Sequence, residues 1–281
     1  MSYSKIKSFA KINLALNVIG KSHSLHKIES IISFLDLYDL ILIKKITNKN
    51  HKIKFKGKFS KNIKNNNTVS MLLKILDQKK LLKMQKFEII INKNIPPEAG
   101  LGGGSMNAAS ILKFLINKKF IKISNLKIIE ISNLIGSDVI LGMYSKSLVL
   151  KSDNRVNKIL NVKTLNALIV KPKFGCSTKN IYSRVKNFSK AKFDNPSKKM
   201  FEFGFLKKMK NDLELIALKK YPKLRVIKTF LEKISGTKFV RMTGSGSAII
   251  AYFKSNKVCK QAEKKVKKEF RNYWCKTAKT I

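Results

Sequence analysis

The chain of 281 residues is long enough for one large domain or two small ones with a substantial buried core. Apolar residues make up 44% of the sequence, which excludes wholesale disorder. No run approaches the roughly 20 apolar residues of a membrane-spanning helix, and the N-terminal segment MSYSKIKSFAKINLAL lacks the apolar block of a secretory signal. The cysteines Cys176, Cys259 and Cys275 form no Cys-x-x-Cys pair, which favours reduced thiols in a cytoplasmic protein.

The net charge of +44 suggests a nucleic-acid or anionic membrane partner. However, only five of the 60 basic residues are arginine, the side chain whose fork suits phosphates and base edges. The lysines are also spread over nearly every segment instead of forming one tail. We therefore expect a lysine-coated surface with no dedicated nucleic-acid partner and no membrane partner. Such a surface would concentrate polyanionic substrates.

The first hundred residues predict mostly strands, because β-branched and other apolar residues dominate them. These strands are expected over 6–19, 28–35, 40–46, 53–59 and 87–92. Thr68 is expected to cap a helix that begins at Val69. A glycine-rich stretch then leads into a helix over 105–115, and a second helix fits 125–134.

Beyond residue 160 the pattern alternates between short strands and helices. Strands are expected over 165–171, 239–242 and 248–253 and near Tyr273, and helices over 177–186, 212–218, 223–234 and 257–270. The chain is therefore predicted to be α+β, with domains over 1–160 and 161–281.

The densest chemical signal is a glycine run before the helix expected at 105. Gly100, Gly102, Gly103 and Gly104 fall within five positions of a chain that has only 13 glycines. Such a run can turn several backbone N–H groups and a helix N-terminus toward one di- or triphosphate. It matches neither a Walker A loop nor a dinucleotide-binding loop. The alternative is a flexible turn between strand and helix.

A second glycine loop, residues 242–248, lies between two predicted strands. By itself it fits an ordinary hairpin, but beside the first loop it could close the other side of a phosphate pocket. Near the N-terminus, alternation places Lys11 and Asn13 on one face of a strand, where they could equally form a plain solvent face. Asp138 is a scarce carboxylate in an apolar setting that could instead cap a helix. His26 could touch a ligand or be merely structural or solvated.

Three separated motifs together resemble the GHMP kinase superfamily. They are 10–16 (AKINLAL) with Gly20 and 26–31 (HKIESI), 96–109 (PPEAGLGGGSMNAA) and 242–247 (MTGSGS). Shorter segments at 135–139, 177–182 and 211–214 are also similar to family segments, so the resemblance spans almost the whole chain in the family's order. It is strongest to the branch of the family whose substrate is a methylerythritol linked to cytidine diphosphate, in the non-mevalonate route to isoprenoids.

The resemblance implies a two-domain fold, with an N-terminal domain like domain 2 of ribosomal protein S5 and a ferredoxin-like C-terminal domain. ATP and the acceptor would meet between the domains, and the γ-phosphoryl group would move to the 2-hydroxyl of the methylerythritol unit. Asp138 would accept or orient the hydroxyl proton, Lys11 would keep that carboxylate ionised, and Asn13 would bind near the same hydroxyl. Mg²⁺ is implied as a cofactor with ATP, and Ser105 would be its ligand.

The remaining roles are carried over from the family's motifs. ATP would be held by Pro96, Pro97, Glu98, Ala99, Gly100, Leu101, Gly102, Gly103, Gly104, Ser105 and Met106. The substrate would be held by Asn13, Leu25, His26, Ser177, Thr178 and Tyr182, with His26 reading the cytosine edge. Thr243, Gly244, Ser245 and Gly246 would form the supporting glycine loop.

The chain departs from the family pattern at two places. Ser24-Leu25-His26 stands where the family usually has Gly-Tyr-His, so the aromatic ring that stacks on cytosine is missing, and Tyr182 is a candidate to replace it. Met106 stands where a second serine is usual. Alternatives are another GHMP small-molecule kinase, of the homoserine or mevalonate type, and an RNA-binding protein with an S5-like domain.

Overall fold

The computed structural model describes residues 2–22, 25–61, 63–144 and 146–281. The chain forms two compact units, unit 1 over 1–11, 37–97 and 102–145 and unit 2 over 12–36, 98–101 and 146–281. The strands β1 (Ser4–Ser22) and β2 (Leu25–Ile46) and the glycine-rich segment contribute residues to both units. The units are therefore interleaved along the sequence, and the contiguous domains 1–160 and 161–281 stay a prediction.

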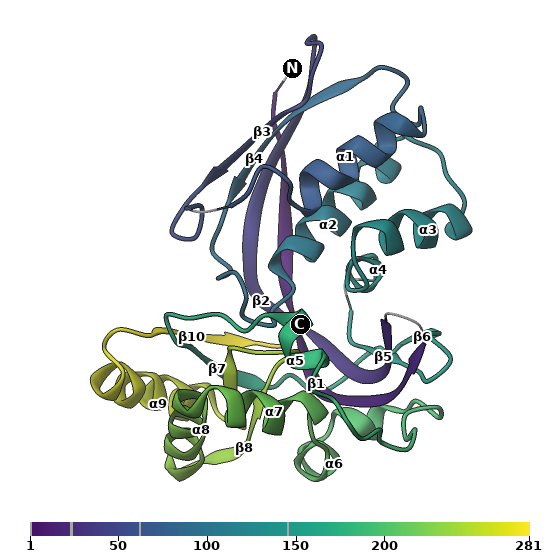
Figure 1. Cartoon of the computed structure of the whole chain (residues 1–281). Coiled ribbons are helices and arrows are strands. Elements are labelled where there is room, and N and C mark those ends of the chain that lie inside the picture. The colour runs from purple at the N-terminus through teal and green to yellow at the C-terminus, as the bar shows by residue number, and fades with distance from the viewer. Residues whose placement is uncertain (1, 23–24, 62, 145) are drawn as a thin grey trace. The chain divides into compact units, whose positions relative to one another are not determined.

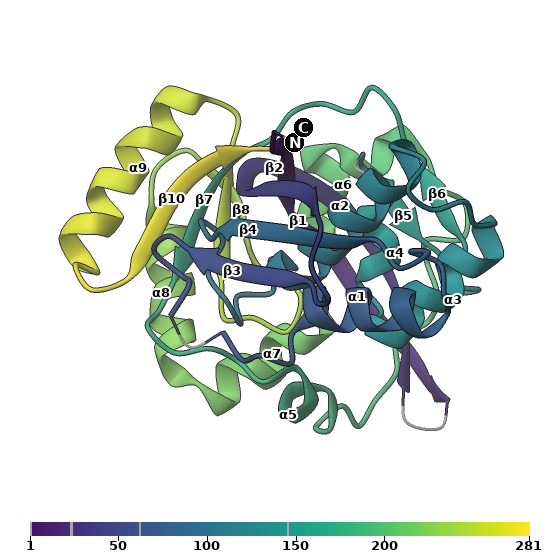
Figure 2. The same ribbon diagram turned by 90° about the horizontal axis from the view of Figure 1, so that it is seen from above.

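Unit 1 is built on a mixed sheet with helices against one face. Its further elements are β3 (Lys52–Lys56), α1 (Thr68–Gln78), β4 (Lys86–Asn92), α2 (Gly103–Asn117), α3 (Asn125–Ile135) and α4 (Val139–Gly142). Strand β4 pairs parallel with β3 and antiparallel with residues 40–46 of β2. Figures 1 and 2 show α1 and α2 side by side. Alternate strand residues such as Ile41, Phe87 and Ile89 are buried with Leu72 and Leu112 of these helices.

The start of α1 differs from the sequence prediction by one residue. Asn67, not Thr68, caps the helix: its side chain accepts the N–H groups of Val69 and Ser70, and Ser70 Oγ accepts the N–H of Asn67. This reciprocal capping box satisfies N–H groups that the first helical turn leaves without partners. The hydroxyl of Thr68 is thereby left to donate to Gly104 O, at 2.7 Å.

Unit 2 contains a four-stranded antiparallel sheet in the order β10-β7-β9-β8. Its further elements are β5 (Leu148–Leu150), β6 (Val156–Lys158), β7 (Asn166–Lys171), α5 (Thr178–Tyr182), a 3₁₀ turn (Lys198–Phe201), α6 (Phe203–Lys208), α7 (Asp212–Lys220), α8 (Pro222–Lys233), β8 (Thr237–Met242), β9 (Ile249–Phe253), α9 (Asn256–Glu269) and β10 (Trp274–Lys279). The sequence of β7, helices, β8, β9, α9 and β10 is the β-α-β-β-α-β arrangement of ferredoxin-like domains. Figure 1 shows α7, α8 and α9 along the same side of this sheet. The α+β prediction is confirmed.

Most differences from the predicted elements concern short segments. The strands expected over 28–35 and 40–46 are one continuous strand, β2, and the helix expected over 177–186 ends at Tyr182. The short elements β5, β6, α4 and α6 were not predicted, because three to six residues carry too little periodicity. Within the described ranges, no helix of either unit has the length and apolar character needed to cross a membrane.

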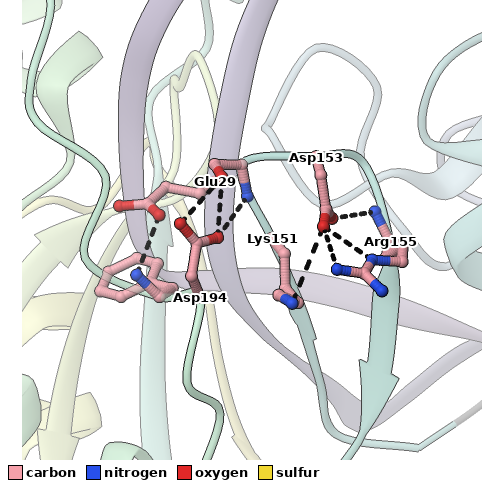
Figure 3. Close-up of polar contacts among 7 residues, drawn as sticks. Glu29, Lys151, Asp153, Arg155 and Asp194 are labelled. Carbon is pink, nitrogen blue, oxygen red and sulfur yellow. Dashed lines mark hydrogen bonds and ion pairs between the residues drawn. The ribbon is translucent and has the colours of Figure 1, made fainter.

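An irregular segment of unit 2 is fastened by two carboxylates, shown in Figure 3. Glu29 of β2 is fully buried and accepts the N–H groups of Lys192 (2.8 Å) and Phe193 (2.9 Å) and the amide of Asn17 (2.7 Å). Asp194 accepts the hydroxyl and N–H of Ser152, which follows β5. Residues 192–194 are thus held in place without regular secondary structure.

The three cysteines are free thiols, as the sequence predicts. Burial raises the pKa of Cys176 to about 11 and the pKa values of Cys259 and Cys275 to about 12. A thiol with so high a pKa is almost entirely protonated at neutral pH and is a poor nucleophile and metal ligand. The cysteines are therefore structural residues.

Candidate active site

Lys11 and Asp138 form an ion pair in unit 1. Lys11 lies on β1, and its Nζ is 3.0 Å from Asp138 Oδ2. The Lys11 side chain is 4% exposed, whereas that of Asp138 is 34% exposed. Lys11 and Asn13 are both buried, which excludes the alternative that they form an ordinary solvent face. A buried lysine needs an anionic or polar partner, and Asp138 provides one that water also reaches.

Asp138 occupies the N-cap position of α4, but its side chain makes no capping hydrogen bond. The sequence left open whether this residue only caps a helix. Asp138 stands at the N-cap position, but its carboxylate is directed at Lys11 instead of at the helix N–H groups. Capping therefore does not account for an acid here.

The first residues of α2 lie beside Lys11. Helix α2 begins at Gly103, two residues before the predicted start, because Gly102 in the left-handed conformation (φ 67°) serves as its N-cap. A Cβ on Gly102 would lie 2.8 Å from Lys11 Cγ, so both the backbone conformation and the close approach require glycine here. The partial positive charge of a helix N-terminus is thus placed next to the Lys11–Asp138 pair.

The next residues of α2 differ in what they expose. Gly104 is exposed and Ser105 is half-buried. Met106 is buried, its N–H donates to Gly102 O at 2.8 Å, and its sulfur lies 3.2 Å from where a Cβ on Gly142 would be. The methionine that replaces the family's usual second serine therefore packs against α4, and Ser105 is the hydroxyl that remains near the helix start.

In unit 2, the second glycine loop holds residues 98–101 of the first. Ser247 N donates to Glu98 O (3.1 Å), Ala248 N donates to Ala99 O (3.2 Å), and Thr243 Oγ1 donates to Gly100 O (3.2 Å). Gly100 has φ 72°, and a Cβ there would lie 2.0 Å from Thr243 O. The loop is thus more than a hairpin, because it fixes the backbone of the phosphate-loop candidate.

Thr243 also fixes Asn13. Its Oγ1 accepts the N–H of Asn13 at 3.0 Å, while Asn13 Nδ2 donates to Ser30 Oγ at 2.8 Å. The loop is held in turn by Asn211, whose Nδ2 donates to Met242 O and Gly244 O, at 2.9 and 2.8 Å. The sequence singled out 211–214 only as a family-like segment. An Asn ahead of a helical pattern signals an N-cap, but nothing local to it indicates this second set of contacts.

The candidate substrate residues His26 and Tyr182 lie together in unit 2. Their ring centroids are 5.1 Å apart, with a tilt of 41°. Burial, followed by the charge of Lys21, lowers the pKa of His26, so the imidazole is neutral at pH 7 and carries one donor and one acceptor nitrogen. Leu25 is 72% exposed, and Ser24 lies outside the described residues.

The hydroxyls of Ser177 and Thr178 already have protein partners. Ser177 caps α5 by accepting the N–H of Asn180, and Thr178 Oγ1 lies 2.9 Å from Ser245 Oγ, a hydrogen bond that either can donate. Ser245 thereby links the supporting glycine loop to the candidate substrate segment within unit 2. Among the described residues, no group of three or more His, Cys, Asp and Glu side chains is arranged to hold a metal ion.

Family models match both parts of the chain. The model of the GHMP kinases N-terminal domain matches residues 66–146, and the model of the GHMP kinases C-terminal domain matches residues 185–272. The chain belongs to the GHMP kinase family, and it has the two-domain fold of that family.

Two curated relatives are called 4-diphosphocytidyl-2-C-methyl-D-erythritol kinase. That of Pelagibacter ubique is 56% identical over 281 residues, with full coverage of both chains. That of Clostridium tetani is 30% identical over 285 residues and covers 99% of this chain and 100% of the relative.

Solved structures show the same fold. A crystal structure of 4-(cytidine 5'-diphospho)-2C-methyl-D-erythritol kinase has a TM-score of 0.80 at 20% identity, covering 98% of this chain and 99% of that one. A homoserine kinase from Cytophaga hutchinsonii has a TM-score of 0.71 at 16% identity, covering 99% and 94%. At such low identity these likenesses concern the fold alone.

Proposed function

We propose that this protein transfers the γ-phosphoryl group of ATP to the 2-hydroxyl of 4-diphosphocytidyl-2-C-methyl-D-erythritol, in isoprenoid precursor synthesis in the cytoplasm. The observation that carries this proposal is the Lys11–Asp138 pair beside the first turn of α2. It brings a carboxylate, a cation and a helix N-terminus together in unit 1. The choice of acceptor in this proposal rests on the name of the full-length relative at 56% identity.

Phosphoryl transfer depends mainly on alignment and on stabilisation of negative charge. In this proposal Asp138 accepts or orients the proton of the attacking hydroxyl, and its partly exposed side chain leaves room for that hydroxyl to approach. The Lys11 ammonium stabilises the negative charge that develops on the hydroxyl oxygen as the proton leaves. Asn13, fixed by Thr243 and Ser30, binds the same hydroxyl.

The residues before and at the start of α2 hold the ATP phosphates through backbone N–H groups. Mg²⁺ fits this set, because it usually keeps several waters and takes one or two protein ligands together with phosphate oxygens. The half-buried hydroxyl of Ser105 at the helix start is the candidate ligand. When bound, Mg²⁺ would neutralise charge on the β- and γ-phosphates.

Cytosine recognition rests on His26 and Tyr182. A neutral His26 can donate to and accept from the polar edge of the base, and Tyr182 offers the aromatic face that Leu25 lacks. Their ring contact supports the two acting as one surface. Stacking on an aromatic side chain contributes roughly 1–3 kcal/mol per base, so Tyr182→Ala should raise the KM for the cytidylyl substrate about 5- to 150-fold. Leu25→Tyr should lower it.

The proposal is tested by assaying the purified chain with ATP and Mg²⁺ against a panel of acceptor alcohols. The panel contains the diphosphocytidyl methylerythritol, the same polyol without cytidine diphosphate, homoserine and mevalonate. We expect turnover with the first acceptor and little with the others. A preference for homoserine or mevalonate would replace the acceptor while keeping the class of enzyme. Absence of ATP turnover with every acceptor would overturn the proposal.

A further inference from the structure

Asp39 is a buried carboxylate of unit 1 with an unusual number of donors. It lies on β2 and is 0% exposed. Its Oδ1 accepts the N–H groups of Asn94 (2.7 Å) and Ile95 (2.9 Å), and its Oδ2 accepts Asn107 Nδ2 (3.0 Å) and the ammonium of Lys93. Carboxylates are almost never fully buried unless they are paired, and this one is paired both by charge and by hydrogen bonds.

These donors lie on both sides of the phosphate-loop candidate in the sequence. Lys93, Asn94 and Ile95 directly precede Pro96, whereas Asn107 directly follows Met106 on α2. Both ends of the eleven-residue candidate are therefore tied to one carboxylate of unit 1. Asn107 Oδ1 is buried and has no hydrogen-bond partner in the described part of the chain, so this buried amide is held through the bond from its Nδ2 to Asp39.

The ammonium of Lys93 lies beside both Asp39 and the first residue of α2. Its Nζ lies 3.3 Å from where a Cβ on Gly103 would be, and Ile95 Cγ2 lies 3.0 Å from that point. Lys93 is 5% exposed. The ammonium thus sits against the first residue of α2, the end of the helix where an anion would bind, and it neutralises the carboxylate behind it.

We propose that Asp39 and Lys93 are positioning residues for ATP, an inference that rests on the proposed function. Asp39 fixes the spacing of the two loop ends before ATP arrives, so that less conformational freedom is lost on binding. Lys93 prevents an uncompensated negative charge from facing the phosphates across a poorly screened interior. Neither side chain touches the nucleotide in this proposal, so the acceptor site is unaffected.

The test uses paired variants, because Asp39→Asn alone would leave Lys93 buried without its counter-ion. The double variant Asp39→Asn with Lys93→Met keeps the size of both side chains close to the original and removes both charges. We expect its Kd for a non-hydrolysable ATP analogue and its KM for ATP to rise about ten-fold or more, with the KM for the acceptor changed less than about two-fold. The matched control is Asp77→Asn with Lys86→Met, another lysine–aspartate pair of unit 1 (2.6 Å), which should leave both ATP constants unchanged.

The affinity for the ATP analogue decides whether the inference holds. ATP-analogue affinity within about two-fold of wild type in the folded double variant overturns it, as does an equal loss in the Asp77–Lys86 control. If the double variant does not fold, Asn107→Ala decides, because it removes the bond between α2 and Asp39 and keeps the Asp39–Lys93 ion pair. An unchanged affinity of this variant for the ATP analogue overturns the inference. Binding of the ATP analogue is measured without turnover. Failure of the proposed acceptor chemistry therefore remains distinguishable from failure of the positioning role proposed for Asp39 and Lys93.

Discussion

The pairs Lys11–Asp138 and Lys93–Asp39 use the same two side-chain types within unit 1, but their surroundings differ. Asp39 is sealed from water and its oxygens are occupied by four donors. Asp138 is one-third exposed and occupies an N-cap position without capping. A carboxylate with every lone pair occupied by protein donors can hold structure but has no acceptor position left for a ligand, whereas one open to water has.

The comparison predicts that the two acids fail in different ways when they are neutralised. Asp138→Asn should lower kcat about 10²- to 10⁴-fold, the range of general acid–base contributions. The free energy of unfolding should fall less than in Asp39→Asn, because Asp138 is one-third exposed and its pair with Lys11 is partly screened by water. Steady-state kinetics together with urea unfolding would check both parts. Full activity would show that Asp138 has no role in proton transfer.

Asp39→Asn should show the opposite balance. It leaves Lys93 buried without a counter-ion, which typically costs about 3–5 kcal/mol in the free energy of unfolding. The unfolding midpoint in urea measures the loss, and adding Lys93→Met should recover a large part of it. If Asp39→Asn were as stable as the wild type, the distinction between a sealed and an open pair would be wrong.

A smaller effect is expected from Gly102→Ala, which disturbs the open pair through its neighbour. The new methyl group would meet Lys11 Cγ, and a left-handed backbone costs an alanine about 1–2 kcal/mol. Displacement of Lys11 should lower kcat about ten-fold, in line with the cost of small misplacements. Gly136→Ala is the control, since Gly136 is extended (φ 163°) and its Cβ would meet nothing within 4 Å. Equal effects in both variants would contradict this account.

The smallest effect concerns pH and a third lysine–aspartate pair, Lys86–Asp77, which His51 joins at 3.2 Å. Burial lowers the pKa of His51 below its ordinary 6.5, and its Nδ1 accepts the N–H of Phe87, which a protonated nitrogen cannot do. The unfolded chain therefore binds a proton that the folded chain excludes. The free energy of unfolding should thus decrease as pH falls below about 6.5.

His51→Phe should flatten that slope, measured by urea unfolding at several pH values between about 5 and 7.5. An unchanged slope in His51→Phe would show that other groups control the acid limb.

Much of the fold, and the importance of Lys11 and Asp138, can be predicted from the sequence. Lys11 and Asp138 stand out because a lysine interrupts an apolar strand and because carboxylates are scarce in this chain. The glycine run indicates an anion site by composition alone. The long elements α1, α2, α8 and α9 have apolar residues at helical spacing, and their existence follows from that periodicity.

The Lys93–Asp39 pair could not be predicted in the same way. Asp39 is visible as an acid within an apolar strand, but its donors come from residues 93–95 and 107, far along the chain. Pairing of β2 with β4 in the observed register brings residues 93–95 to Asp39, and the packing of α2 brings Asn107 there. The roles of Asn211 and Ser247 likewise depend on long-range packing that no local pattern encodes.

The clasp between the two glycine loops has a consequence for how the protein is made. Glu98, Ala99 and Gly100 are held by Thr243, Ser247 and Ala248, which leave the ribosome about 145 residues later in synthesis. Residues 98–100 of a nascent chain therefore lack these hydrogen bonds until the C-terminal sheet has emerged. Under the proposed function, newly made chains would gain ATP affinity only near the end of translation, and truncation before residue 243 would remove it.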